Sequence, residues 1–182
     1  MLKYKHLQEE LQSLGSNVVQ EARRNLTKEG HNVTRKLFNS IGYYEKNKNG
    51  VYSIEWFMDK YGLYVDQGVH GTKSSYVTAR NSPYKYKSTS GVIGLEYNTG
   101  IFAKWAKSKR IRLRDEKGKF QKGNYKSIGF ILARSIKEKG IKPTMFMTKA
   151  FRTSYVGLYK KISQAIAKDI AEDIKQDNKN TK

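Results

Sequence analysis

The spacing of apolar residues changes twice along this chain, and these changes limit the folds open to it. Near the N-terminus, steps of three and four predict a long amphipathic helix from Lys3 to about Lys28. From Val51 to Phe57 apolar and polar residues alternate, which predicts a strand. Steps of three and four return after residue 124. This order of helix, strands and helices predicts an α+β fold and not a series of βαβ units.

The strand region has the pattern of a hairpin that forms a small antiparallel sheet. Asn47–Gly50 separates Tyr43–Lys46 from Val51–Phe57, and Asn-Gly is a favoured hairpin turn. A short helix is predicted before it, over Val33–Ile41, and one or two helical turns after it, over residues 61–65. Gly68 and Gly71 are expected to end that segment.

Residues 72–126 are expected to form an extended loop or arm, because their pattern is mostly polar, with a short helix near residues 101–106. Two C-terminal helices are then predicted to pack on the sheet. The first covers residues 124–139, and the second begins after Thr144, an expected N-cap. We therefore expect one α+β domain over residues 1–176 and a polar tail over 177–182.

Composition removes several classes of function. The chain has no Cys, and its three His residues are far apart in the sequence, so neither thiolate nor His-based metal sites are expected. No apolar run approaches the roughly 20 residues of a membrane span, and the N-terminus lacks a signal-peptide pattern. We expect no cofactor, no membrane partner, and synthesis in a cytoplasm.

Motifs for catalysis are also weak. Gly68–Lys73 resembles a phosphate loop but lacks its Gly-x4-Gly-Lys spacing, and no Gly-x-Ser-x-Gly segment is present. Glu55, Asp59 and Asp66 lie within twelve residues, which leaves a divalent-metal nuclease open as an alternative. Nothing in their spacing forces them together. We expect a protein that is not an enzyme.

Positive charge is the strongest signal. The formal net charge is +20, which favours polyanions or an acidic protein face as partners, although a solvated Lys-rich surface is the alternative. The charge is dense after residue 106, where Arg110–Arg114 alternates and Asp115–Gly118 can turn, so a hairpin arm is expected. Aromatic residues that include Phe120 and Tyr125 interleave with these cations. The candidate contacts with DNA or an acidic partner are Lys107, Lys109, Arg110, Arg112, Arg114, Lys117 and Lys119.

Two stretches resemble the neck and tail-completion proteins of tailed bacteriophages. In Trp56–Lys73 the pattern is Tyr-Gly/Ala-x-x-Val-(Asp/Glu)-x-Gly-x-x-Gly, and in Ala133–Ala150 it is Ile-x-x-Lys-Gly-(Ile)-x-Pro-x-x-Phe. The order of elements between them is also similar. The matching positions are Tyr61, Val65, Asp66, Gly68, Gly71, Gly140, Pro143 and Phe146.

The resemblance implies an α+β subunit without catalytic activity that forms a homo-oligomeric ring at the head–tail junction of a virion. Its partners would be portal or adaptor proteins or tail-tube proteins, with possible contact to packaged DNA. A basic nucleic-acid-binding protein is the alternative. The Tyr-rich stretch from Tyr76 to Tyr97 suits contact between neighbouring subunits, because Tyr side chains have an apolar body and a polar tip. The candidate interface residues are Tyr76, Tyr84, Tyr86 and Tyr97.

Overall fold

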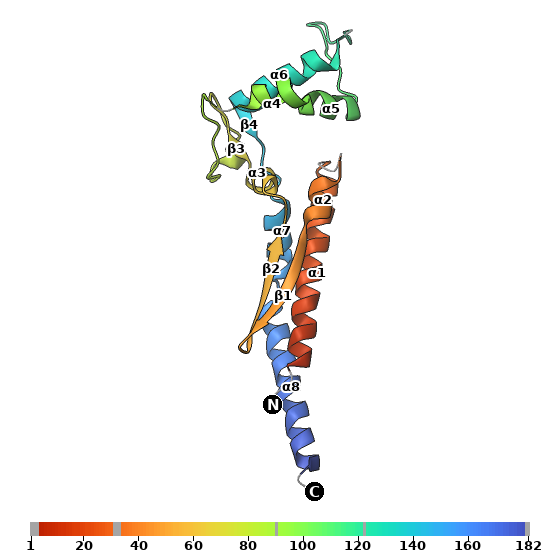
Figure 1. Cartoon of the computed structure of the whole chain (residues 1–182), viewed down its shortest axis with the longest axis vertical. Helices are drawn as coiled ribbons and strands as arrows, with labels where there is room; N and C mark the ends of the chain where they lie inside the picture. The colour runs from red at the N-terminus through yellow and green to blue at the C-terminus, as the bar shows by residue number, and fades with distance from the viewer. Residues whose placement is uncertain (1–3, 31–33, 90, 122, 181–182) are drawn as a thin grey trace. The chain divides into compact units, whose positions relative to one another are not determined.

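The computed structural model describes residues 4–30, 34–89, 91–121 and 123–180 (Figure 1). It has the expected α+β composition, with a long N-terminal helix, an antiparallel hairpin and C-terminal helices packed against it. Where the sequence predicted one domain over residues 1–176, contacts group the chain into two compact units. The first unit contains Met1–Asp59 and Phe146–Lys182, and the second contains Lys60–Met145.

The first unit is built around its N-terminal helix, which contacts the hairpin and both C-terminal helices (Figure 1). Val18, Ala22 and Leu26, which belong to the predicted apolar stripe, are completely buried there together with Phe146 and Ala150. Burial of this stripe is the main source of helix stability in such a unit. The elements are α1 (Lys5–Lys28), α2 (Lys36–Ser40), β1 (Gly42–Lys48), β2 (Val51–Phe57), α7 (Phe146–Ser154) and α8 (Leu158–Asn180). Of the predicted second helix, Val33 lies outside the described residues.

The hairpin confirms the predicted turn, and its first strand is three residues longer than predicted, because Gly42, Asn47 and Lys48 also belong to it. Lys48 pairs with Val51, so Asn49 and Gly50 alone form the loop. Their φ angles of 54° and 80° are those of a turn that follows the twist of the strands, and Asn-Gly tolerates them best. On the inner face, the Trp56 ring meets Phe151 of α7 edge to face, with ring centroids 5.0 Å apart.

Gly15 lies inside α1 for a packing reason. A Cβ at this position would overlap the Tyr43 ring on β1. The Trp56 Nε1 also donates to the Gly15 carbonyl at 3.4 Å. Gly15 therefore allows the hairpin to approach α1 closely, at a helix-propensity cost of about 1 kcal/mol.

The predicted last helix is divided into α7 and α8 around Gly157, whose φ is 72°. Thr144 does not cap α7: its hydroxyl donates to the Val65 carbonyl at 3.0 Å, and Met145 intervenes with a φ of 54°. The polar tail expected from Asp177 continues α8 as far as Asn180. Residues 181–182 lie outside the described part of the chain.

The second unit contains the predicted helix over residues 124–139, which forms α6 and packs against two short helices. The Asn124 side chain caps it by accepting from the Ser127 N–H at 2.9 Å. The expected loop over 72–126 is therefore partly helical, and α4 lies where the sequence predicted none. The elements are α3 (Tyr61–Gln67), β3 (Val69–His70), η1 (Val77–Ala79), α4 (Val92–Thr99), α5 (Ile101–Ser108), α6 (Tyr125–Lys139) and β4 (Gly140–Ile141). None of the helices in the described ranges is long and apolar enough to cross a membrane.

Candidate functional site

The basic segment after α5 forms the predicted hairpin, which we call the basic arm and define as residues 110–121. Arg114 and Phe120 form an antiparallel bridge, and the Gln121 N–H donates to the Leu113 carbonyl at 2.9 Å. The turn between them is held by Asp115, whose carboxylate accepts from the backbone N–H of Lys117 and Lys119. The arm is therefore a hydrogen-bonded hairpin and not an unstructured loop.

Alternation along the arm separates its charges from its apolar side chains. Arg112 and Arg114 are exposed, whereas Ile111 and Leu113 are half-buried. The Phe120 ring lies beside the cations, with the Arg114 guanidinium 4.2 Å and the Arg112 guanidinium 5.8 Å from its centroid. The ring itself is 60% exposed. The arm thus presents an aromatic ring and two guanidinium groups to solvent together.

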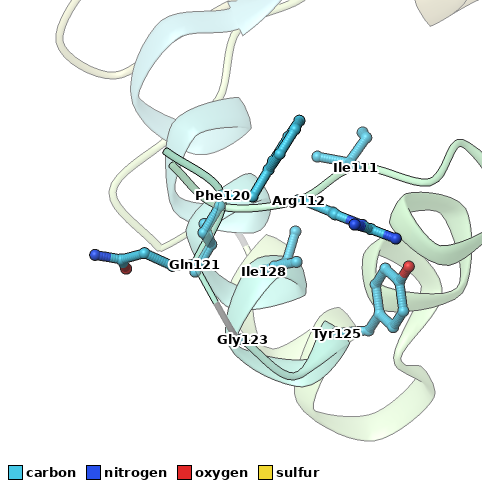
Figure 2. A pocket seen from close by; sticks show the side chains of 8 residues that line it. Ile111, Arg112, Phe120, Gln121, Gly123, Tyr125 and Ile128 are labelled. Carbon is cyan, nitrogen blue, oxygen red and sulfur yellow. The ribbon is translucent and has the colours of Figure 1, made fainter. Parts of the chain in front are cut away.

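A hollow of about 270 Å³ lies under the arm, between it and the start of α6 (Figure 2). Ile111, Leu113 and Ile128 give it an apolar lining, and Phe120 and Tyr125 add aromatic rings. Figure 2 shows the Arg112 guanidinium and the Tyr125 hydroxyl pointing toward one another. Polar groups and apolar surface therefore meet in one open hollow.

The positive charge is concentrated in the second unit. Residues 60–145 include 19 Lys and Arg against five Asp and Glu, a net charge of +14, which leaves +6 of the total for the first unit. Among the ion pairs of the described residues, none includes Arg110, Arg112, Arg114, Lys117 or Lys119. Their charge is therefore directed at solvent or a partner.

Four of the five acidic residues of the second unit have structural roles. Asp66 is buried, and Asp115 holds the turn of the arm. Lys73 binds Glu138 at 2.9 Å and lowers the pKa of that carboxyl. Glu96 is buried on α4 and accepts from the backbone N–H of Phe102 and Ala103 at the start of α5. No local sequence pattern indicated the role of this last carboxylate, which occupies space that Gly129 leaves, because a Cβ there would overlap it.

The four candidate interface tyrosines have different environments. Tyr84 packs against Tyr64 with ring centroids 4.6 Å apart, and burial raises the pKa of Tyr86. The backbone of both residues also bonds to His70, so this part of the stretch belongs to the fold of its own unit. Tyr76 is 41% exposed and Tyr97 is 79% exposed. Tyr76 and Tyr97 are thus the two with most surface for a partner.

The two stretches that resemble phage proteins meet in space. Val69 pairs with Ile141 and His70 with Gly140, so β3 and β4 form a short antiparallel sheet. Val65 and Asp66 accept backbone hydrogen bonds from Thr144 and Met145, at 3.1 and 2.9 Å. We call this pairing of residues 65–71 with 138–145 the glycine junction.

The glycines of the junction allow its two segments to come close. A Cβ at Gly68 would lie 2.6 Å from the Ile141 carbonyl oxygen, and one at Gly71 would overlap the Glu138 carbonyl. Gly140 has a φ of 88° and faces the Val69 carbonyl. Pro143 is buried in the junction, whereas Tyr61 lies at the exposed start of α3. The last motif position, Phe146, is fully buried in the first unit, where its carbonyl accepts from Asn25.

The candidate metal ligands do not form one site. Glu55 lies on the exposed face of the hairpin, where Lys46 and Tyr44 bind it and lower its pKa. Asp59 lies 3.9 Å from Lys36 in the same unit, and Asp66 is buried in α3 of the other unit. No group of three or more His, Asp or Glu residues in the described ranges could hold a metal ion. The nuclease alternative therefore has no supporting geometry.

Comparisons with known proteins found no match that could identify this site. No protein-family model matches the chain, and the searches of curated proteins and of solved structures gave no significant match.

Proposed function

We propose that this chain is a non-enzymatic virion subunit of a tailed bacteriophage that forms an oligomeric ring at the head–tail junction, as a neck, connector or tail-completion protein. The observation that carries the proposal is the glycine junction. Both stretches that resemble the phage proteins contribute to it, although about 70 residues separate them. The resemblance therefore applies to one joined piece of structure and not to two unrelated short motifs.

Exposed apolar side chains support assembly. Val77 and Tyr97 in the second unit are 88% and 79% exposed. A ring requires heterologous contacts, in which one patch of a subunit meets a different patch of the next. Tyr76 and Tyr97 are the interface residues that we favour. The proposed partners are further copies of the chain and the portal, adaptor or tail-tube proteins of the same virion, assembled in a bacterial cytoplasm.

Light scattering and negative-stain imaging of the full chain test the proposal, alone and with portal and tail-tube proteins from the same genome. We expect closed rings in at least one mixture. Tyr97→Lys should weaken ring formation, whereas Tyr159→Lys serves as the matched exposed control. A chain that stays monomeric in every mixture contradicts the proposed function.

A basic nucleic-acid-binding protein is the second candidate function, and the net charge of +14 in the second unit supports it. Such a protein binds DNA or RNA as a monomer, with an affinity that falls steeply as salt rises. Nucleic-acid binding without any ring in the imaging experiment favours this alternative.

A further inference from the structure

We propose that the basic arm is a single-strand-binding element, in which the arm's cations hold phosphates and the hollow beside Phe120 holds an unpaired base. The inference goes beyond the proposed function and does not depend on ring formation. It rests on three features of the second unit: cations that form no ion pair with the described residues, an exposed ring among them, and a hollow with both apolar and polar lining.

The cations of the arm are arranged for phosphates. Arg112 and Arg114 are both exposed and lie two residues apart, which is about 6.6 Å along an extended backbone, and the Arg112 guanidinium also reaches the edge of the hollow. This spacing is comparable to the distance between phosphates of an extended single strand. Glu116 is the only acidic residue of the arm besides Asp115, and Asp115 is engaged in the turn. The arm therefore offers phosphate contacts with little competing negative charge.

The exposed Phe120 ring and the hollow fit a base. A base has flat faces that stack on aromatic rings or guanidinium planes, and polar edges that accept and donate hydrogen bonds. Phe120 and the two arginines beside it supply the stacking surface. The hollow supplies apolar walls from Leu113 and Ile128, with the Arg112 guanidinium and the Tyr125 hydroxyl at its edge (Figure 2).

An acidic protein segment fits these features less well. Carboxylates would satisfy the arginines, but they would leave the Phe120 ring and the apolar hollow without a flat partner. Paired bases of a duplex are also stacked internally and cannot enter a hollow between the arm and a helix. We therefore expect the single strand to bind more tightly than the duplex, with little dependence on base sequence.

Fluorescence anisotropy of the full-length protein measures this preference. The probes are fluorescein-labelled oligothymidine, the same strand in a duplex with oligoadenine, and a labelled polyglutamate peptide of equal charge. We expect tightest binding to the single strand. Phe120→Ala should weaken that binding by about fivefold to 150-fold, the range that base–aromatic stacking gives, and change duplex binding by less than about twofold. Tyr159→Ala, at an exposed ring in the first unit, is the matched control and should change neither.

The salt dependence of binding tests the role of the two arginines of the arm separately. Arg112→Gln with Arg114→Gln should lower the slope of log affinity against log salt by about two, whereas Lys160→Gln with Lys161→Gln in α8 should leave it within about half a unit. Equal binding of polyglutamate and oligothymidine overturns the inference in favour of an acidic protein partner. Equal losses of single-strand and duplex binding in Phe120→Ala also overturn it, because the ring then does not contact an unpaired base. Rings that form while no nucleic acid binds at low salt overturn this inference alone. A single-strand preference without rings supports it and counts against the proposed function.

Discussion

The buried carboxylate of Asp169 on α8 caps the first turn of α1 by accepting from the backbone N–H of His6 at 2.8 Å. The N–H of Leu7 donates to its other oxygen at 3.0 Å, and the residue is 3% exposed. Tyr4, the residue before α1, makes no side-chain cap of its own. One acid thus satisfies two N–H groups of a helix that lies more than 160 residues earlier in the chain.

We expect Asp169→Ala to destabilise the first unit by about 1–2 kcal/mol, because two partly buried N–H groups lose their acceptor. Urea unfolding followed by Trp56 fluorescence measures the change, and amide exchange at residues 6 and 7 localises it. Glu116→Ala removes an equal charge from the exposed arm and should have little effect. An unchanged exchange rate at both amides shows that the cap is not needed.

The His6 side chain forms a second contact between α1 and α8, and this contact is sensitive to pH. The Glu172 carboxylate, 3.0 Å from Nε2, raises the pKa of His6, and His6 in turn lowers the pKa of Glu172. Asp169 on α8 and Glu9 on α1 also face the ring and favour its charged form, and Lys5 acts on Glu172.

A raised His pKa contributes stability that is complete below the unfolded value near 6.5 and is lost as the pH rises through the folded value. A lowered Glu pKa contributes stability that is present above the unfolded value near 4.5 and is lost as the pH falls. The pair therefore stabilises most between these two values. The urea midpoint should fall from about pH 6 to about pH 8.5 more in the native chain than in His6→Gln. Parallel changes in both proteins remove His6 from the explanation.

The helices and strands that were predicted correctly are those specified by residues close together in the sequence. Asn49-Gly50 specified the hairpin turn, and the apolar stripe that ends at Leu26 specified α1 and its buried face. The α4 helix was missed because Gly94, Asn98 and Thr99 are weak helix formers, and α4 is instead stabilised by packing against α6.

Contacts between residues far apart in the sequence could not be predicted from such local patterns. Nothing near Gly71 in sequence indicates that Glu138 lies against it, and nothing near His6 indicates Asp169. The candidate site was predicted in part for the same reason. Charge density and alternation identified the basic arm, whereas the hollow depends on Ile128, which comes from α6.

The glycine junction gives a matched pair of substitutions. Gly71→Ala places a Cβ against the Glu138 carbonyl, so β3 and β4 must separate, and we expect a loss of about 2–3 kcal/mol. Gly94→Ala adds a Cβ in open space on α4 and should be neutral or stabilise by up to about 1 kcal/mol. Amide exchange at Val69 and Ile141 measures the junction in both variants. Equal protection in the two variants contradicts the close approach.

Glu96 and Gly129 act together between α4, α5 and α6. The Glu96 carboxylate accepts from the N–H of Phe102 at 2.7 Å, and Gly129 leaves the space that it occupies. Gly129→Ala should therefore displace the carboxylate from the start of α5 and destabilise the second unit by about 1–3 kcal/mol, despite the higher helix propensity of Ala.

Glu96→Ala removes the acceptor and should cost a similar amount, because the two N–H groups lose their partner. The double variant, Glu96→Ala with Gly129→Ala, should cost less than the sum of the two, since the new methyl group then enters space that the carboxylate has left. Urea unfolding followed by Trp105 fluorescence measures all three variants. Additive losses would mean that the two positions act independently and that the carboxylate does not occupy the space beside Gly129.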